Sequence, residues 1–477
     1  MSSEQMRDLN EYDVLVVGAG LAGYAAAISA SECGASVLLL EKMHTYGGST
    51  AWSGGAFCFA DTEDQAAAGI KDCDALLRMD LTRGGEEKSN PELIDLYLTR
   101  QREIYRWLKG LGVTFTPPVL SPGQSVPRSH GASPRVLLDL LHEHFLRQAH
   151  CRYIAGADVL GVERDGEGVA RILRVCISGE TNTLAARRAV VIATGGFSRS
   201  QDLFKRYAPW LENAKRMGGE GATGDGLKMG IALGGDITDF DYLEGSFGAI
   251  LPNYPSPKAW SENDTTLMHA EYSGAIVLNK LGRRFVNESQ SYRKLGAICL
   301  KQPGAVAFQL FDQSVMDTSR SEPVTRNFKA AFDRNLIHRA NSIREAAQIM
   351  GLPADVVEAE VAEYNRHIEY GEEPAFGRNS LLNGEGKPFP LVNAPFYIYA
   401  CTTGISSTLA GLVANGRMAL LDTYGDEVPG VFLAGEVVGG FHGPISVSGT
   451  ALSKAAIFGK TAGENAARFS TSVNAGL

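Results

Sequence analysis

Three glycines with the spacing Gly18-x-Gly20-x-x-Gly23 separate an apolar segment from a helix-forming one. Residues 12–17 are apolar enough for a buried parallel strand, and the small residues after Gly23 favour a helix. In that context a glycine turn lets backbone approach a pyrophosphate, whose charge is attracted by the free N–H groups and dipole of the helix N-terminus. We therefore predict that a dinucleotide is bound by Gly18, Gly20, Leu21, Ala22 and Gly23.

An acidic residue follows the glycine turn at the distance that ribose binding requires. Residues 35–42 predict a second strand, and Glu41 stands near its carboxyl end. An acid about 20 residues beyond such a turn holds a ribose hydroxyl. Glu41 and Lys42 are therefore predicted to contact the cofactor. The acid favours an adenosine ribose without a 2′-phosphate, but it does not choose between FAD and NAD.

Later glycine-rich segments favour FAD. Residues 47–55 form a second glycine- and hydroxyl-rich loop, residues 187–198 predict a strand that runs into Ala-Thr-Gly-Gly, and residues 430–467 predict a strand, a loop and a helix. We expect Glu436 to hold a ribitol hydroxyl and the last helix to aim N–H groups at the flavin. The further FAD contacts are predicted to be Gly47, Gly48, Ser49, Thr50, Ser53, Gly54, Gly55, Ala193, Thr194, Gly195, Gly196, Gly435, Glu436, Gly449, Thr450, Ala451 and Leu452.

The cofactor motifs lie on both sides of a long region that mixes strands and helices. Residues 275–288 predict strands, and residues 342–351 and 355–370 predict helices. The predicted fold is α/β, a discontinuous Rossmann-like FAD-binding domain with an inserted α+β capping domain. The expected boundaries are 1–236 and 386–477 for the FAD-binding domain and 237–385 for the cap, with linkers near 235–240 and 375–392.

Composition excludes several classes of protein. The chain has 477 residues, 44% of them hydrophobic, and a formal net charge of −9, which argues against nucleic acid as a partner. No apolar run reaches the ~18 residues that a membrane span needs. The seven cysteines form no C-x-x-C pair, and the N-terminus resembles no signal peptide. We predict a cytoplasmic protein without a metal site, whose partners are a small-molecule substrate and an unidentified electron acceptor.

The order of motifs resembles the fumarate reductase/3-ketosteroid dehydrogenase superfamily of FAD proteins over nearly the whole length. The segments that carry the resemblance are GAGLAG, LLLEK, GGSTAWSGG, ATGG, GDGLKMG, GRRFVNES, PFY, VFLAGEVVGGFHG and SGTAL. The resemblance implies non-covalent FAD, an inserted cap, and hydride transfer between flavin N5 and a substrate carbon. The bond made or reduced is a C=C bond next to a carbonyl.

Particular positions favour the ketosteroid dehydrogenase branch. Ser446 stands where the fumarate reductases carry an arginine that holds a substrate carboxylate. Tyr292, five residues after Asn287, matches the tyrosine that serves as base in the ketosteroid enzymes. The resemblance further implies that a tyrosine near PFY, either Tyr397 or Tyr399, holds the substrate carbonyl with the backbone amide around Gly404. Arg293 is the rival of Tyr292, as proton donor or as carboxylate ligand.

These positions leave three hypotheses for the activity. The first is an FAD-dependent dehydrogenase that desaturates a cyclic ketone or keto acid, either steroid-like or small, such as 4-oxocyclohexanecarboxylate. The second is an ene-reductase of an unsaturated carboxylic acid, and the third is a non-catalytic FAD-binding protein. His130, in the run Arg128-Ser129-His130, is a further candidate for contact with substrate or flavin.

Overall fold

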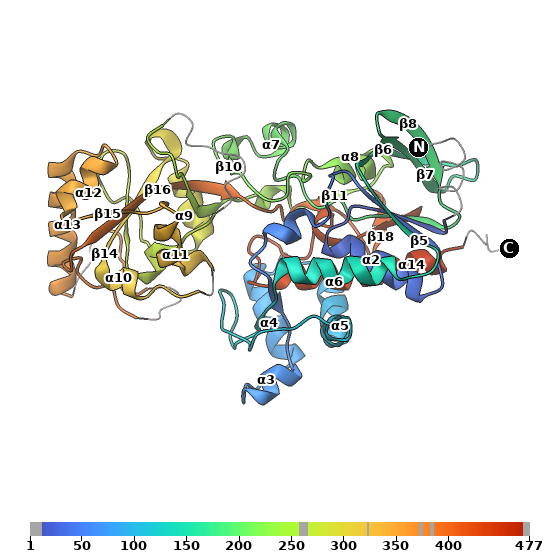
Figure 1. Ribbon diagram of the computed structural model, residues 1–477, viewed down its shortest axis with the longest axis horizontal. Helices are drawn as coiled ribbons and strands as arrows, with labels where there is room; N and C mark the ends of the chain where they lie inside the picture. Colours follow the sequence, from blue (N-terminus) through green and yellow to red (C-terminus); the bar gives the residue numbers. More distant parts are fainter. Residues whose placement is uncertain (1–11, 257–265, 322–323, 372–374, 382–385, 471–477) are drawn as a thin grey trace. The chain divides into compact units, whose positions relative to one another are not determined.

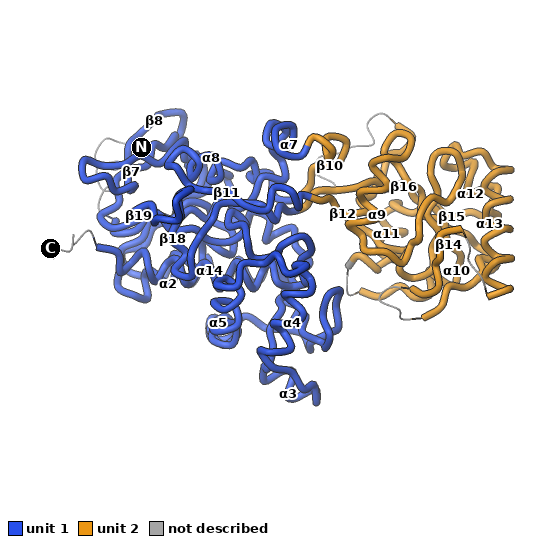
Figure 2. The backbone as a smooth tube through the Cα atoms, turned by 180° about the vertical axis from the view of Figure 1, so that it is seen from behind, with its two compact units in different colours: residues 1–208, 218–243, 407–477 blue, residues 209–217, 244–406 orange. Residues whose placement is uncertain are grey.

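The chain folds into two compact units. The computed structural model describes residues 12–256, 266–321, 324–371, 375–381 and 386–470. Unit 1 comprises Met1–Ala208, Gly218–Leu243 and Ser407–Leu477, and unit 2 comprises Pro209–Met217 and Glu244–Ser406 (Figure 2). Unit 1 is thus assembled from three segments, and each unit is described by itself below.

Unit 1 is built around a mainly parallel sheet (Figure 1). Its strands, in spatial order, are β18 (Ala419–Leu421), β19 (Glu427–Leu433), β9 (Ala189–Ile192), β1 (Val14–Val17), β2 (Val37–Glu41) and β5 (Cys151–Ala155). Only β18 runs antiparallel to its neighbour. All residues of β1, β2 and β9 are buried, which explains their continuous apolar sequences. The predicted strands after and before the glycine turn are therefore confirmed.

Two helices pack on each other and on this sheet. Helix α2 (Leu21–Glu32) follows the glycine turn, and α14 (Thr450–Arg468) is the last helix. They approach closely because α14 carries glycines: a Cβ at Gly459 would lie 2.4 Å from the Ala22 carbonyl oxygen, and one at Gly463 would lie 2.1 Å from that of Ala26. The small-residue sequence of α2 therefore serves helix–helix packing.

The remaining elements of unit 1 surround this core. A three-stranded sheet, β6 (Ala157–Arg164), β7 (Ala170–Ile177) and β8 (Glu180–Ala185), contacts β2, β9 and β19. The helices are α3 (Glu63–Ala67), α4 (Asp74–Gly84), α5 (Pro91–Gly110), α6 (Pro134–Leu146), α7 (Gln201–Tyr207) and α8 (Asp225–Ala232). Short strands pair as β3 (Ala56–Cys58) with β4 (Ser129–Gly131) and as β11 (Ile237–Thr238) with β17 (Gly411–Leu412).

Unit 2 is organised by one long central strand, β16 (Phe396–Ile405). It pairs with β10 (Lys215–Arg216), β12 (Ser246–Ile250), β14 (Ala307–Asp312) and β15 (His338–Ala340), and β14 pairs in turn with β13 (Ile276–Leu278). Side chains of β16 alternate between two buried clusters: Tyr397 and Tyr399 face one, and Ile398 faces the other.

Helices cover both faces of this sheet. Residues of α9 (Tyr292–Cys299), α10 (Gln313–Asp317) and α11 (Phe328–Asp333) complete the cluster that contains the two tyrosines. Residues of α12 (Ile343–Ile349) and α13 (Ala354–Glu369) complete the other. The helices predicted over 342–351 and 355–370 are therefore present. The strand predicted over 275–288 is shorter, because the chain turns at Gly282 (φ +74°) and Leu278 bridges back to Arg284.

The division into units differs from the boundaries expected from the sequence. Residues 386–406 lie in unit 2, because β16 is the centre of its sheet. Residues 237–243 lie in unit 1, where Thr238 pairs with Gly411. Pro209–Met217 joins unit 2 through the pairing of β10 with β16. The linker expected over 375–392 and the boundary at 385 include residues 382–385, which lie outside the described residues.

Within the described ranges, no helix is both long and apolar enough to cross a bilayer.

Candidate functional site

The glycine turn after β1 is a close crossing of three pieces of backbone. Gly18 has φ +102°, and a Cβ there would lie 2.5 Å from the carbonyl oxygen of Ala193. A Cβ at Gly23 would lie 1.8 Å from the carbonyl oxygen of Gly18, so α2 can approach β1 only without a side chain at that position. The turn thus holds the N-terminus of α2 directly beyond the carboxyl end of β1, where parallel sheets bind nucleotides.

The second glycine-rich loop is hydrogen-bonded to the first. The Gly47 amide donates to the Ala19 carbonyl (2.9 Å), and the Leu21 amide at the start of α2 donates to Thr50 Oγ1 (3.2 Å). Ser49 Oγ accepts from the Gly219 amide (3.2 Å). The first turn of α2 contains no acidic residue and its N-cap residue, Gly20, supplies no side-chain cap, so its positive end is available to a phosphate.

Glu41 is buried at the carboxyl end of β2, beside the glycine turn. Its Oε2 accepts from the Ala19 amide (2.8 Å) and its Oε1 from the Met43 amide (2.9 Å). Each carboxylate oxygen keeps a further lone pair for a ribose hydroxyl. The Lys42 amine is engaged elsewhere, since it donates to Asp225 Oδ2 and Thr223 Oγ1 at 2.7 Å each. These two bonds hold the Lys42 amine within unit 1, and the contact of Lys42 with the cofactor stays a prediction.

The Ala-Thr-Gly-Gly segment and Glu436 meet although about half the chain separates them. A Cβ at Gly196 would lie 2.3 Å from Glu436 Oε1, and this oxygen accepts from the Thr408 amide at 2.7 Å. A Cβ at Gly435 would lie 2.7 Å from the Cβ of Ala22 in the first turn of α2. Burial raises the pKa of the Glu436 carboxyl. Glu436 thus stands beside the N-terminus of α2, as a ribitol ligand requires.

The last helix presents a second uncapped N-terminus. Gly449 (φ +85°) precedes α14, gives it no side-chain cap, and is followed by a first turn without acidic residues. Thr450 is fully buried and its hydroxyl donates to the Val447 carbonyl (2.6 Å). Ala451 is exposed, whereas Leu452 is buried. This helix end suits the electron-rich O2 edge of a flavin.

Three observations test whether FAD fits these residues. Thr194 Oγ1 is buried and has no hydrogen-bond partner among the residues that the structure describes. A Cβ added at Gly195 would meet nothing within 4 Å, and one at Gly20 would point at the Gly47 carbonyl oxygen 3.7 Å away. Gly195 and Gly20 thus leave the backbone open, and Thr194 has a hydroxyl without a partner among the described residues. These groups lie between the N-termini of two helices, as the binding of an extended dinucleotide requires. The segments expected to bind FAD therefore fit it.

A buried charged cluster in unit 1 has no signal in the sequence. Lys454 on α14 is 3% exposed, and its amine donates to the Val438 carbonyl (2.6 Å). Burial lowers the pKa of Lys454 to about 8, although Glu436 and Asp239 oppose the shift. Asp239 Oδ2 accepts from the Gly440 amide (2.7 Å). Only the fold could reveal this cluster, because its members come from separate segments.

Tyr292 and Arg293 begin helix α9 of unit 2. Ser291 caps the helix, with its hydroxyl accepting from the Lys294 amide (3.4 Å). Tyr292 is half-buried, Arg293 is 6% exposed, and the guanidinium carbon lies 5.8 Å from the centre of the tyrosine ring. The Tyr292 hydroxyl makes no hydrogen bond to the residues described here. It is thus available to a substrate.

The other predicted tyrosines are engaged within unit 2. The Tyr397 hydroxyl donates to Gln313 Oε1 (2.8 Å), and that of Tyr399 donates to the Met268 carbonyl (3.3 Å). Burial raises the pKa of Tyr399 well above its ordinary value. Gly404 pairs with both β10 and β12, and a Cβ there would lie 2.2 Å from Met217 Sδ. In this structure all three residues serve the packing of the sheet.

His130 has a structural role in unit 1. Its Nδ1 lies 2.7 Å from the Arg128 carbonyl oxygen and its Nε2 2.9 Å from Thr62 Oγ1. Arg128 is itself fully buried between Asp72 and Asp80. Because both ring nitrogens are used inside the unit, the suggested contact of His130 with substrate or flavin is not supported.

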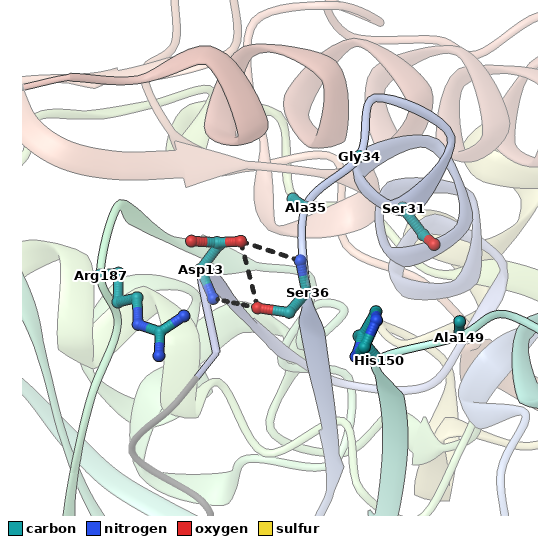
Figure 3. A pocket seen from close by; sticks show the side chains of 8 residues that line it. All are labelled: Asp13, Ser31, Gly34, Ala35, Ser36, Ala149, His150 and Arg187. Atoms are coloured by element: carbon teal, nitrogen blue, oxygen red, sulfur yellow. Dashed lines mark hydrogen bonds between the residues drawn. The ribbon is translucent and has the colours of Figure 1, made fainter.

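A cavity of about 350 Å³ lies elsewhere in unit 1 (Figure 3). Its lining includes Asp13 and Ser36, whose side chains are hydrogen-bonded to one another (3.1 Å). Both residues precede the first residues of β1 and β2, at the opposite end of those strands from Gly18 and Glu41. Ligands of parallel sheets bind at the carboxyl ends, so this cavity is not the cofactor site.

Known proteins are similar to this chain in sequence and in fold. The family described as FAD binding domain matches residues 13–452. A probable fumarate reductase of Shewanella frigidimarina is 27% identical over 95% of this chain and 74% of its own, and a urocanate reductase of Eggerthella lenta is 29% identical over 96% and 75%.

Two solved structures share the architecture. The open conformation of a flavocytochrome c3 fumarate reductase superposes with a TM-score of 0.84, at 25% identity over 98% of this chain and 81% of that one. A 3-ketosteroid-Δ4-(5α)-dehydrogenase of Rhodococcus jostii superposes with a TM-score of 0.71, at 24% identity over 96% of both chains. The chain belongs to the FAD binding domain family, and it is an FAD-dependent oxidoreductase related in sequence to fumarate reductases.

Proposed function

We propose that this protein reduces a C=C bond conjugated to a carbonyl group in a small substrate, with Tyr292 as the proton donor. The observation that carries the proposal is the contrast among the candidate tyrosines. Tyr292 is half-buried at the start of α9, and its hydroxyl makes no hydrogen bond to the described residues. The hydroxyls of Tyr397 and Tyr399 donate hydrogen bonds to groups inside unit 2. One tyrosine can therefore exchange a proton with a substrate, but the pair expected to hold a ketone oxygen is otherwise occupied.

The relatives support the direction of reduction. Two relatives, of which this chain covers 74% and 75%, are named as reductases of fumarate and of urocanate, both of which are conjugated unsaturated acids. Our expectation from the sequence placed ketone desaturation first. Since a hydride and a proton are exchanged at the same two carbons in both directions, that reaction is the reverse of the one proposed.

The residues of this chain perform three tasks in the proposed reaction. Bound FAD supplies the hydride that reaches the β carbon. The residues of the glycine turn, Glu41 and Glu436 hold the cofactor. The Tyr292 hydroxyl gives its proton to the α carbon, and the nearby Arg293 guanidinium and the positive end of α9 stabilise the negative charge that develops on the phenol oxygen.

The substrate class follows from a side chain that is absent. Ser446 stands where the resemblance predicts the arginine that binds a carboxylate of a dicarboxylate substrate. Arg293 supplies one cation near Tyr292. We therefore infer a substrate with one carboxylate or with a ketone, and not fumarate itself.

Desaturation of a cyclic ketone is the second candidate function. It is favoured by Ser446, since a ketone needs no arginine in that position, and by a tyrosine at position 292 that matches the base of the ketosteroid enzymes. In that direction Tyr292 would accept the α proton.

Anaerobic stopped-flow spectroscopy of the FAD-loaded protein tests the proposal. Dithionite-reduced protein is mixed with acrylate, urocanate, fumarate and cyclohex-2-enone, and flavin reoxidation is followed by absorbance. We expect reoxidation by a ketone or a monocarboxylate and none by fumarate. Bleaching of oxidised protein by cyclohexanone or 4-oxocyclohexanecarboxylate, without reoxidation by any unsaturated compound, would establish the second candidate instead. The proposal fails if no compound in the panel changes the flavin spectrum.

Tyr292→Phe is the matching variant. It should slow reoxidation by about 10²–10⁴-fold, the usual contribution of a general acid, while FAD stays bound in unit 1. Tyr397→Phe is the control, because it removes a hydroxyl that is spent on Gln313. Equal rates for the two variants would remove Tyr292 from the mechanism.

A further inference from the structure

A buried histidine–glutamate pair lies against Tyr292. His269 Nδ1 is 2.9 Å from Glu271 Oε1, and the two residues are 8% and 0% exposed. The imidazole ring centre lies 5.7 Å from that of Tyr292, with the ring planes inclined at 36°. The three side chains come from two segments of unit 2: His269 with the turn Ala270–Ser273 that follows it, and the start of α9. No motif in the sequence had drawn attention to this pair.

The Glu271 carboxylate is incompletely satisfied. Oε1 faces His269, but Oε2 is buried and has no hydrogen-bond partner in the described part of the chain. Over the same residues, His269 is the only basic side chain within ion-pair distance of this carboxylate. Leaving a buried carboxylate oxygen without a hydrogen bond destabilises the folded protein. A sequence under no constraint except stability would place an apolar side chain here.

The surroundings hold the pair in one orientation. The His269 amide donates to the Thr325 carbonyl (3.0 Å), and the Glu271 amide donates to Gln309 Oε1 (2.9 Å). Arg378 donates to the Glu271 carbonyl (2.7 Å) and not to its carboxylate. With Nδ1 turned toward Glu271, the imidazole keeps Nε2 for proton exchange.

Other titratable and charged groups also face the pair. Tyr272 lies 5.4 Å from the imidazole, between ring centres, and its hydroxyl donates to the Gln290 carbonyl (3.0 Å). Burial raises the pKa of Tyr272, so it stays protonated over the working range. Arg293 stands beside Tyr292, and Arg326 acts electrostatically on Tyr272. Unlike these groups, the imidazole of His269 has two ring nitrogens, so it can accept a proton on one atom and release one from the other.

We propose that His269 and Glu271 act through Tyr292 as its proton relay, an inference that rests on the proposed function. After Tyr292 has given its proton to the substrate α carbon, the phenolate takes a proton from His269 Nε2 through one intervening water molecule, because no hydrogen bond joins the two side chains directly. The imidazolium becomes neutral imidazole and is protonated again from solvent. Glu271 keeps its charge, stabilises the imidazolium and fixes its tautomer, as the acid does in a serine–histidine–aspartate triad. The redox change is confined to the hydride transfer.

Kinetics of the variants test the relay in the FAD-loaded protein. With a substrate that reoxidises the wild-type flavin, we expect His269→Asn to lower turnover about 100-fold, within the range for lost acid–base assistance. Glu271→Gln should move the alkaline limb of the pH–rate profile to lower pH, because the imidazolium loses its counter-charge. Tyr272→Phe is the matched control, since it removes a hydroxyl next to the same imidazole but leaves the pair intact. Wild-type rates and pH profiles in both test variants would overturn the relay.

A measurement without substrate separates this inference from the proposed function. In histidine-labelled ¹⁵N NMR of the FAD-loaded protein, the resonance missing from His269→Asn identifies the ring. We expect a proton on Nδ1, and a shift of the Nε2 signal in Tyr292→Phe but not in Tyr397→Phe. If no substrate is reduced by the wild type but these shifts occur, the proposed function fails and the coupling stands. If the chemical shift of Nε2 is the same in Tyr292→Phe as in the wild type, the relay is overturned even if turnover is observed.

Discussion

The cofactor cradle of unit 1 and the proton-transfer group of unit 2 are built from different parts of the polypeptide. In the cradle the working atoms are backbone amides and carbonyls, brought together where glycines remove side chains, as at Gly18, Gly23 and Gly196. In unit 2 they are side-chain atoms of Tyr292, His269 and Glu271, held by a helix start and a tight turn. Where two backbone segments cross, an added Cβ would collide with a backbone atom. A proton-transfer group depends instead on the residue types at a few positions.

This contrast explains why the substrate can vary within a shared fold. Binding of a common cofactor needs the same backbone path, and the TM-score of 0.84 with a flavocytochrome c3 fumarate reductase is reached at 25% identity. The residues that select and protonate a substrate are side chains on a scaffold that stays constant, so they can be exchanged singly. We expect Ser446, which stands where the resemblance predicts an arginine in the fumarate reductases, to be one such exchange.

Gly23→Ala should produce the largest effect, because it adds one carbon at the tightest crossing of the cradle. The new Cβ would lie 1.8 Å from the Gly18 carbonyl oxygen, a backbone atom that cannot move without opening the β1–α2 turn. We expect loss of bound FAD, measured as the ratio of flavin to protein absorbance after purification. Gly110→Ala is the control: no atom lies within 4 Å of that position, so FAD should be retained. A flavin-loaded Gly23→Ala protein would show that the cradle tolerates side chains and would remove the contrast.

Lys454→Met should change the free energy of unfolding by an intermediate amount that depends on pH. This variant tests whether a charged side chain also matters in unit 1. Burial lowers the pKa of Lys454 to about 8 in the folded protein, whereas an unfolded lysine keeps its proton to about pH 10.4. Between these values the unfolded chain binds more protons, so this group makes the free energy of unfolding rise as pH increases.

Urea denaturation at pH 7 and pH 10 measures this contribution. The free energy of unfolding of the wild type, minus that of Lys454→Met, should increase with pH by up to about 3 kcal/mol, since one pKa unit corresponds to about 1.4 kcal/mol. Because other groups titrate in both proteins, only the difference is informative. Parallel pH dependences would mean that Lys454 titrates normally in the folded state.

Tyr399→Phe should produce the smallest effect and sharpens the contrast within unit 2. Its hydroxyl is buried and donates to the Met268 carbonyl at 3.3 Å. Removing it should cost about 1 kcal/mol of stability, the usual net value of such a bond, and should leave the rate of flavin reoxidation unchanged. Thermal denaturation and stopped-flow measurement on the same sample provide both readings. If flavin reoxidation slows about as much as in Tyr292→Phe, Tyr399 would instead be a ligand of the substrate carbonyl.

The sequence by itself determined the cofactor-binding half of this protein. Gly18, Gly20, Gly23 and Glu41 could be identified because their role depends on local geometry: a positive φ, a crossing a few residues away, and a carboxylate at the end of the next strand. Two helices of unit 2, α12 and α13, also followed from local periodicity. Such features depend on neighbours in sequence, so spacing is sufficient to find them.

Only the tertiary structure decided which side chains are hydrogen-bonded within the protein and which remain available to a substrate. Tyr397 and Tyr399 read as candidate ligands in the sequence, but pairing of β16 turns both into the core beside Gln313 and Met268. His269 and Glu271 carry no sequence signal, and they gain a role because the fold sets them against Tyr292, more than 20 residues away. The reason is physical: a hydroxyl or an imidazole is chemically the same wherever it occurs, and the partners that use it come from distant segments of the chain.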